Sequence, residues 1–470
     1  MPTLRHLLMV GLCLNAILTA CSPATAVSTS APLPTVLPQP TLPLATIAPT
    51  PEPVGVGVPA IEYGDDKSEL LVFSAVTGKP LDLFTPIPIE DFSGYAFAPD
   101  GRTLTFVAKA KLYFIDLPSW KYRTFDVDLH GWLSAVVYSP DGTLLALASG
   151  LPDGDLRIVD AKSGEVKTSA QAGFAIRNIK FTSDGKALMV YGPHLIAEIS
   201  AGPPKAALFA VSDLSVLWSA ELKGIRHGIF PKKPGPVDIY QPGAAWNYAP
   251  GIAFSPDSDI LYLVHSDEDK LTTVDFTHRK VNTVDVHVTT SWLDQLLSFT
   301  AGVVHAKGMD GTAKQAVISP DGKLLFVGGN TEAVTMQADG INWDVTDTPL
   351  PLQVIDTGDG TLLAEIDAQA TPTRLSRDGK QIFLSGWKRD NNSATQWTDV
   401  YDMSSKMLVK RIDNVDLVLT RRIDGKPMLV GNEYIGSNGE DVCKISSLDL
   451  LTLTILNTWK GSCVGWLSTP

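Results

Sequence analysis

The tetrapeptide Ser-Pro-Asp-Gly and close variants of it recur along the chain, and each copy separates two apolar runs. In such a turn Pro presets φ, the Asp side chain bonds its own backbone, and Gly accepts a positive φ. Two β-rich runs joined by a short Gly-containing turn predict a β-hairpin. The clearest copy is Ser319-Pro-Asp-Gly322, which lies between the runs Ala-Val-Ile and Leu-Leu-Phe-Val.

Seven copies of this turn set a period for the chain. Their Asp residues stand at positions 100, 141, 184, 257, 321, 378 and 424, so that successive copies are 41, 43, 73, 64, 57 and 46 residues apart. A base period in the low forties is the length of a four-stranded propeller blade. A third strand ending in Asp, as at residues 156–160, and a fourth after a Gly-bearing turn, as at residues 361–366, complete each unit. We therefore predict an all-β chain: a single β-propeller of four-stranded antiparallel blades, in which only residues 291–304 could hold a short helix.

The repeat also carries a family resemblance. The pattern Ser-Pro-Asp-Gly-x-x-Leu-x-Val followed by Val-Ile-Asp-x-x-x-Gly, clearest in residues 316–366, resembles the YVTN-type and WD-repeat-like β-propellers of bacterial exported proteins. It is also similar to the superfamily that includes the TolB propeller and the heavy chain of quinoprotein amine dehydrogenases. The resemblance covers residues 59–470 and implies the fold, whereas propellers of this kind host many unrelated functions.

The two ends of the repeated region predict how the ring closes. Residues 60–63, 70–74 and 80–84 read as three strands before the first repeat, and residues 463–467 read as one unmatched strand after the last. Joined as a split blade, with the inner strand from the C-terminus, they would close the ring without an unpaired edge. This arrangement predicts eight blades. Seven is the alternative, reached if the terminal strands merge into the last repeat.

The N-terminal residues indicate export and anchoring. Residues 1–20 form a signal peptide, with Arg5 before an apolar run at residues 7–18. The signal ends in Leu18-Thr-Ala-Cys21, which resembles the bacterial lipobox and implies that Cys21 becomes the lipidated first residue of a membrane-anchored, extracytoplasmic lipoprotein. The alternative is an ordinary signal peptide in which Cys21 is incidental. Residues 21–58 are rich in Pro, Thr, Ser and Ala and carry one charge, Glu52, which predicts an extended tether.

Two cysteines remain within the predicted propeller, Cys443 and Cys463. Disulfides persist in exported proteins, and a bridge between these residues could fasten the last repeat. The alternative is a pair of buried free thiols that act as small hydrophobic groups.

Composition and motifs argue against several kinds of function. The net charge of −13 and the pI of about 5.1 argue against nucleic-acid binding. The sequence shows no zinc-type His spacing, no Cys-x-x-Cys, no Gly-x-Ser-x-Gly and no phosphate-binding Gly loop. Turn chemistry accounts for the acidic stretches at residues 265–269 and 356–360. We therefore expect no metal, no cofactor and no catalytic residue, and a non-enzymatic role is favoured.

Extra residues accumulate at one end of the predicted blades. The Asp-Gly turns are uniformly short, whereas the connections assigned to the opposite end are extended at residues 193–205, 223–249, 287–311, 331–351 and 386–398. Binding residues often lie on loops over a rigid scaffold, and Trp, Tyr and Arg often anchor interfaces. We hypothesise a ligand-binding face that includes Arg226, His227, Trp246, Trp292, His305, Trp343, Trp387 and Arg389. The alternative is that the aromatic residues pack the long loops onto the propeller.

Three functions follow from these features. The favoured one is a monomeric binding or scaffolding module, held at a membrane by its lipid and presenting its loop-rich face to a protein, a glycan or a small ligand. The second is a subunit of a redox system, implied by the resemblance to amine dehydrogenase heavy chains, with the cofactor on a partner. The third is an enzyme with a site at the channel mouth, for which Arg177, Arg374 and His305 are the nearest candidates.

Overall fold

The described residues of the computed structural model belong to one compact unit, Glu52–Pro470. They contain strands and turns, and no helix among them is long and apolar enough to cross a membrane. The predicted signal peptide, Cys21, nearly all of the tether and the short helix at residues 291–304 lie outside the described residues. The described ranges are 57–63, 68–82, 84–89, 92–108, 110–127, 133–150, 153–196, 199–232, 244–288, 311–336, 343–368, 370–376, 379–390, 393–405, 407–413, 416–424, 427–434, 442–449, 454–462 and 464–467.

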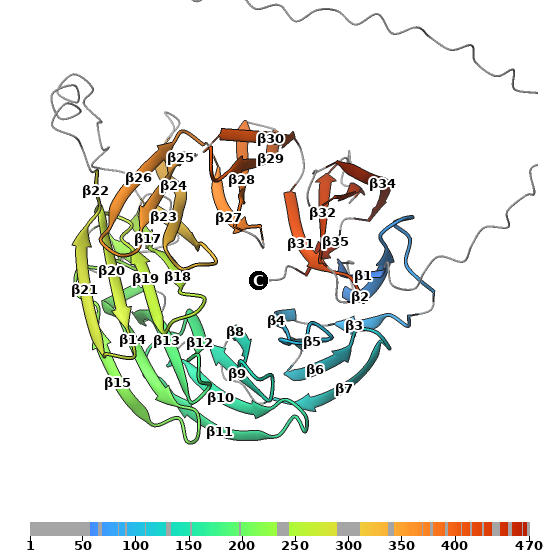
Figure 1. Cartoon of the computed structure of the whole chain (residues 1–470), viewed down its shortest axis with the longest axis horizontal. Coiled ribbons are helices and arrows are strands. Elements are labelled where there is room, and N and C mark those ends of the chain that lie inside the picture. Colours follow the sequence, from blue (N-terminus) through green and yellow to red (C-terminus); the bar gives the residue numbers. More distant parts are fainter. Residues whose placement is uncertain are drawn as a thin grey trace, which may run out of the picture. The chain divides into compact units, whose positions relative to one another are not determined.

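Five of the sheets are four-stranded antiparallel meanders of consecutive strands, as the repeat predicts (Figure 1). Two of them follow each other in the first half of the chain: β4 (Phe92–Phe97), β5 (Thr103–Ala108), β6 (Lys111–Asp116) and β7 (Lys121–Asp126); then β8 (Leu133–Tyr138), β9 (Leu144–Ser149), β10 (Asp155–Asp160) and β11 (Val166–Gln171). The other three are β18 (Gly251–Phe254), β19 (Ile260–Val264), β20 (Lys270–Asp275) and β21 (Lys280–Asp285); β27 (Thr371–Leu375), β28 (Gln381–Asp390), β29 (Ser393–Asp402) and β30 (Met407–Asp413); and β31 (Asp416–Arg421), β32 (Pro427–Tyr434), β33 (Val442–Leu448) and β34 (Ile455–Ser462).

One larger sheet has eleven strands and contains two further meanders. The first is β12 (Asn178–Phe181), β13 (Ala187–Ile196), β14 (Ile199–Ala210) and β15 (Val216–Glu221), and the second is β23 (Gly311–Ile318), β24 (Leu324–Met336), β25 (Trp343–Asp356) and β26 (Thr361–Ile366). Three short strands complete it: β16 (Gly228–Pro231), β17 (Ala245–Ala249) and β22 (His287–Val288). The sheets stand around a common centre, as in a β-propeller (Figure 1).

The remaining sheet joins the two ends of the described chain. Its order is β3 (Ile87–Ile89), β2 (Ser68–Ser74), β1 (Gly57–Tyr63) and β35 (Val464–Trp466). Strand β35 pairs antiparallel with β1, and Ile61 lies opposite Gly465. The strand predicted at residues 80–84 is wrong, because Pro80 makes only an isolated bridge to Phe73. The edge strand is β3 instead, in which buried Ile87 and Ile89 flank an exposed Pro88; an edge strand tolerates a residue without an N–H.

The recurrent turn has the chemistry that the sequence predicts. The Ser139 hydroxyl donates to Asp141 at 2.6 Å, and the backbone N–H of Thr143 donates to the same carboxylate at 3.0 Å. Gly142 closes the turn with a φ of 72°. Ser319 and Gly322 repeat this arrangement, with a serine–aspartate bond of 2.6 Å and a φ of 71°. Because side chain and backbone fix the same reversal, each copy connects a first strand to a second.

Both turns at one end of a blade are tied together by hydrogen bonds. The residue that opens the third-to-fourth-strand turn donates its N–H to the carbonyl beside the Asp-Gly turn of the same blade, as Ala161 does to Thr143 at 2.9 Å. The same bond recurs from Val211 to Lys186 and from Met403 to Lys380. We call this end of the blades, which holds the Asp-Gly turns and the third-to-fourth-strand turns, the turn face. The opposite end, which holds the second-to-third-strand and inter-blade connections, is the insertion face.

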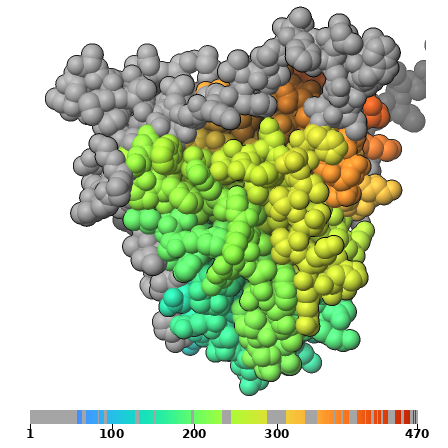
Figure 2. Space-filling model, turned by 90° about the vertical axis from the view of Figure 1, so that its left-hand side faces the viewer, coloured from blue at the N-terminus to red at the C-terminus, as the bar shows by residue number. Residues whose placement is uncertain are grey.

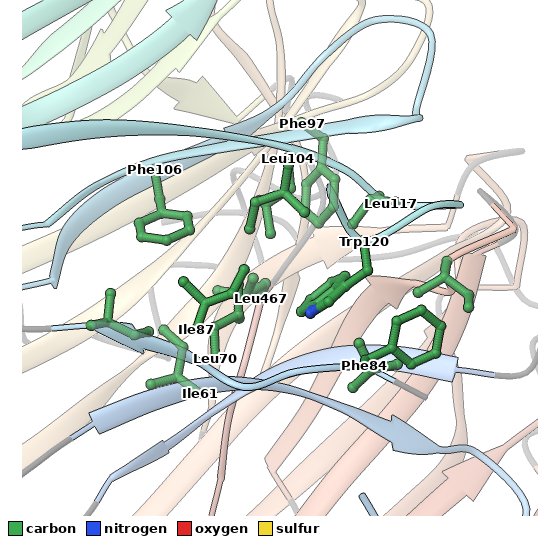
Figure 3. Packing of buried hydrophobic residues seen from close by; sticks show 14 of the residues in the cluster. Ile61, Leu70, Phe84, Ile87, Phe97, Leu104, Phe106, Leu117, Trp120 and Leu467 are labelled. Atoms are coloured by element: carbon green, nitrogen blue, oxygen red, sulfur yellow. The ribbon is translucent and has the colours of Figure 1, made fainter. Parts of the chain in front are cut away.

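The core lies between neighbouring sheets. Figure 3 shows the cluster between the β1–β3 strands and the β4–β7 sheet, where Ile61 and Ile87 lie opposite Leu104 and Phe106. Leu467, which follows β35, enters the same cluster. Burial of each such side chain contributes roughly 1.5–3 kcal/mol, so the sheets hold one another through their faces.

Candidate functional site

The insertion face is built largely from elongated strands. Three predicted loop extensions continue the second and third strands of their blades as two-stranded ribbons. Strands β13 and β14 stay paired as far as Ile196 and Ile199, β24 and β25 as far as Met336 and Trp343, and β28 and β29 as far as Asp390 and Ser393. Backbone hydrogen bonds therefore make these extensions regular structure rather than irregular loops.

A fourth extension, at residues 223–249, forms a hairpin that links two blades. Strands β16 and β17 pair antiparallel, with Phe230 opposite Trp246. Strand β16 also pairs in parallel with β14 at Ile199, and β17 pairs in parallel with β23 from Asn247 onward. The hairpin thus joins the β12–β15 and β23–β26 meanders into one sheet. Along the chain, the β18–β21 blade stands between these two meanders. Figure 2 shows these blades from their outer side, where the green of β15 adjoins the yellow of β21.

Arg226 fastens this hairpin to the neighbouring blade. Its Nε lies 3.2 Å from the Asp267 carboxylate, in the turn between β19 and β20. The guanidinium also lies 5.2 Å from the ring centre of Tyr248 and 5.8 Å from that of Phe230. Half of the Arg226 side chain remains exposed, so the ion pair contributes at most about 1 kcal/mol to stability. Much of this cation is therefore available on the surface.

His227 is buried directly beside Arg226. Its Nδ1 lies 2.9 Å from the Tyr191 hydroxyl, and the two rings stack with centres 5.7 Å apart. Burial, assisted by the positive charge of Arg177, lowers the pKa of His227 to about 4. Burial also raises the pKa of Tyr191 well above its ordinary value. Both groups are therefore neutral at pH 7 and share one hydrogen bond.

Close packing fixes the position of Tyr191 and Arg177. The Arg177 N–H donates to the Tyr191 carbonyl at 2.9 Å. A Cβ on the next residue, Gly192, would overlap the carbonyl oxygen of Ala175. Only glycine lets β13 approach the segment that carries Arg177 this closely. The exposed Arg177 side chain is thereby held near the buried His227.

A second buried histidine lies in the β19–β20 turn. His265 is 1% exposed, and its Nε2 lies 2.8 Å from the Thr272 hydroxyl, which is in turn 2.8 Å from that of Thr283. The His265 Nδ1 is buried without a hydrogen-bond partner. Burial lowers the pKa of His265; the carboxylates of Asp267 and Glu268 oppose this shift, and the positive charges of Lys270 and Lys314 add to it.

Lys314, whose amine acts electrostatically on His265, lies on the inner strand β23. Burial lowers the pKa of Lys314, while the carboxylates of Asp269 and Asp267 oppose that effect. Among the described residues, Lys314 has neither an ion pair nor a hydrogen bond from its amine. We call Arg177, Tyr191, Arg226, His227, His265, Asp267 and Lys314 the His227 cluster. It combines two arginines, a lysine whose charged form burial disfavours, one paired carboxylate, a buried tyrosine and two neutral imidazoles, all of which can form hydrogen bonds or ion pairs with a polar ligand.

The predicted binding residues have three different outcomes. Arg226, His227 and Trp246 lie together at the β16–β17 hairpin, where the Lys232 amine is 5.9 Å from the Trp246 ring. Trp292 and His305 lie outside the described residues. The backbones of Trp343, Trp387 and Arg389 belong to the elongated strands, and their side chains are not described. The binding role of these residues stays a prediction.

The channel-mouth candidates have different surroundings. Arg177 interacts with His227, whereas Arg374 lies on β27, where burial lowers its pKa and Tyr95 is its electrostatic neighbour. Sequence reasoning missed Tyr191 and Lys314 because they stand within ordinary blade strands. It noticed the turn that holds His265, but only as an acidic tip.

Among the described residues, no three His, Cys, Asp or Glu side chains are grouped so that they could hold a metal ion. Cys443, 3% exposed on β33, is disulfide-bonded, whereas Cys463 lies outside the described residues.

Comparisons with known proteins support the fold alone. No family model matches the chain, and no curated protein matches it in sequence. Its fold is similar to that of many solved structures, with 1181 matching chains, so the likeness selects no single function. One of them is the dihydro-heme d1 dehydrogenase NirN in complex with DHE, with a TM-score of 0.50 and 11% identity over 90% of this chain and 77% of that chain. At this identity the similarity concerns the β-propeller architecture.

Proposed function

We propose that this chain is a lipid-anchored, extracytoplasmic β-propeller that binds a partner through its insertion face. The observation that carries the proposal is the one-sided elaboration of the blades: elongated ribbons and the β16–β17 hairpin occupy the insertion face, while the Asp-Gly turns opposite stay short. Elaboration of one end of a rigid scaffold is typical of recognition surfaces. The His227 cluster supplies charged and aromatic groups there.

We further propose eight blades in a closed ring, within the wider group of YVTN and WD-repeat-like propellers. Six four-stranded sheets and the two meanders of the eleven-stranded sheet support the count. The pairing of β35 with β1 supports closure by a split blade. An experimental structure with seven radial sheets would contradict the count.

The lipid anchor rests on residues 18–21 and has a direct test. Wild-type protein expressed in a bacterial host should incorporate labelled palmitate and fractionate with membranes, whereas Cys21→Ser should do neither. Cys13→Ser is the matched control, because Cys13 lies within the signal and should leave labelling unchanged. Labelling that survives Cys21→Ser would refute the anchor.

Partner binding is tested by a pull-down from solubilised native membranes. The triple variant Trp246→Ala, Trp292→Ala, Trp387→Ala should lose the partner while its melting temperature stays near that of wild type. Lys186→Ala on the turn face, where the side chain is 84% exposed, is the control and should retain the partner. A large fall in the melting temperature of the triple variant would favour the packing role of these residues instead.

Two other functions have their own tests. The redox alternative, a propeller subunit whose partner carries the cofactor, draws on the fold similarity to a dihydro-heme d1 dehydrogenase, and co-purification of a partner whose cofactor absorbs visible light would support it. The enzymatic alternative draws on the proximity of neutral His227 to Tyr191 and Arg177. Turnover of a hydrolase or lyase substrate that is lost in His227→Gln would support it over simple binding.

We also propose that Cys443 is bonded to Cys463. Beyond residues 1–21 these are the two cysteines of the sequence, and Cys443 is disulfide-bonded. Peptide mapping without reduction should find the two linked in one peptide pair.

A further inference from the structure

Exposed large apolar side chains gather at one end of the propeller. In the part of the chain that the structure describes there are ten of them, and all ten lie at the turn face. Each stands either in a third-to-fourth-strand connection or among the first three residues of an outermost strand. They are Val76, Tyr122, Val216, Leu217, Leu363, Met407, Leu408, Val409, Ile455 and Leu456. We call this set the apolar rim.

The apolar rim is densest on two neighbouring blades. Strand β30 begins with Met407, Leu408 and Val409, which are 68%, 44% and 53% exposed, and β34 begins with Ile455 and Leu456, which are 54% and 56% exposed. Both strands are the outermost of their sheets and lie at the outer edge of Figure 1. Outer edges are usually protected by charged residues or Pro. Apolar runs at this position therefore indicate a surface that is covered in use.

The N-terminal segment joins the propeller at the same face. Strand β1 starts at Gly57, whose carbonyl accepts a hydrogen bond from the Ile423 N–H at 2.8 Å. Ile423 stands in the Asp-Gly turn between β31 and β32, which marks the turn face. Residues 21–56, which begin with the proposed anchor at Cys21, are thus attached beside the blades where the apolar rim is densest.

We propose that the apolar rim rests on the surface of the lipid bilayer, so that the insertion face points away from the membrane. The rim runs at one level along several blades instead of forming a single patch, which fits a broad, flat surface. Its side chains include Tyr122 and aliphatic groups, which partition into the membrane interface.

With the lipid anchor in place, a weak apolar contact is sufficient to orient the propeller on the bilayer. This inference rests on the proposed lipidation of Cys21. Because the tether would hold the protein at the bilayer, docking becomes an intramolecular step, which raises the effective concentration of the membrane surface. A few partly inserted side chains then bias the orientation without the affinity that a free protein needs.

The test measures which end of the anchored protein meets lipid. Full-length lipidated protein is reconstituted in phosphatidylcholine vesicles, with a fluorophore attached through Met407→Cys on the apolar rim or through Lys223→Cys, an exposed position on the insertion face. Brominated lipids should quench the label at position 407 several-fold more strongly than that at 223. Adding Leu408→Ser and Ile455→Ser should weaken the quenching at 407.

Each other outcome overturns the inference. Equal quenching at both positions, or none at 407, would show that the apolar rim does not meet lipid. If 407 is shielded from quencher and sedimentation shows a dimer, the rim instead covers a second copy. Incorporation of palmitate is measured on the same samples, so a missing anchor is recognised separately from a rim that does not dock.

Discussion

Burial of His227 predicts a specific loss of stability in acid. The pKa of His227 in the folded chain is about 4, below the ordinary 6.5, because the ring is 8% exposed. Above pH 6.5 the imidazole is neutral in both folded and unfolded chains, so its protonation does not affect the unfolding free energy. Between pH 6.5 and pH 4 the His227 ring is protonated in the unfolded chain but not in the folded chain, so the unfolding free energy falls. From pH 7.5 to 4.5 the loss is about 2.5 kcal/mol, at 1.36 kcal/mol per pKa unit.

Chemical unfolding of wild type and His227→Gln across this range isolates that contribution. The variant lacks the titrating ring. The unfolding free energy of the variant minus that of wild type should therefore rise by about 2.5 kcal/mol between pH 7.5 and pH 4.5, whatever this difference is at pH 7.5. Tyr191→Phe is the control: it removes the hydroxyl but leaves the ring buried, and burial is the main cause of the shift. It should therefore retain the wild-type pH dependence. Parallel curves for wild type and His227→Gln would refute the reasoning.

Three further predictions concern stability. Arg411→Ala should lower the unfolding free energy by about 2 kcal/mol, because it removes two hydrogen bonds of 2.7 Å from the fully buried Asp399 carboxylate, although water at the half-exposed Arg411 site compensates in part. Arg411→Lys should recover some of this loss, and an Arg411→Ala variant as stable in urea as wild type would contradict the prediction. Gly192→Ala should lower the unfolding free energy by about 3 kcal/mol or more, because the new Cβ would overlap backbone atoms. Gly142→Ala should lower it by about 1 kcal/mol, because φ is 72° there but the nearest atom is 3.4 Å from the new Cβ. Equal melting temperatures for the two variants would contradict this prediction. Cys443→Ser should cost about 3 kcal/mol, and reducing agent should destabilise wild type but not this variant.

The blade was predictable because its information is local. Ser139, Asp141 and Gly142 determine a turn through bonds among themselves, and that turn fixes which strands pair. The apolar runs on either side then become the first two strands of a blade. A signal that repeats seven times leaves little freedom for other all-β architectures.

The terminal blade and the insertion face were less predictable, since distant partners decide them. Residues 80–84 are apolar enough for a strand, but Leu81 and Phe84 join the core cluster from outside a strand, and Ile87–Ile89 pairs with β2 instead as β3. Strands β16 and β17 are only four and five residues long, too short for a periodic pattern to indicate a hairpin. Nothing in either segment specifies that β16 pairs with β14 and β17 with β23.

The His227 cluster was predictable only in part. Arg226 and His227 attracted notice because they stand in a long connection between blades. Tyr191 and Lys314 stand at regular strand positions, where a sequence shows no difference between a packing residue and one that faces a neighbouring histidine. Their significance comes from the way that adjacent blades bring β13, β19 and β23 together.

The central claim is that the two ends of the propeller have different roles, with recognition on the insertion face. Photo-crosslinking in intact cells tests it most directly, with a photoreactive phenylalanine analogue placed at Trp246 on the insertion face or at Lys186 on the turn face. We predict a discrete protein adduct from position 246 and none from position 186. Adducts from position 186 alone, or the same adduct from both positions, would contradict the claim.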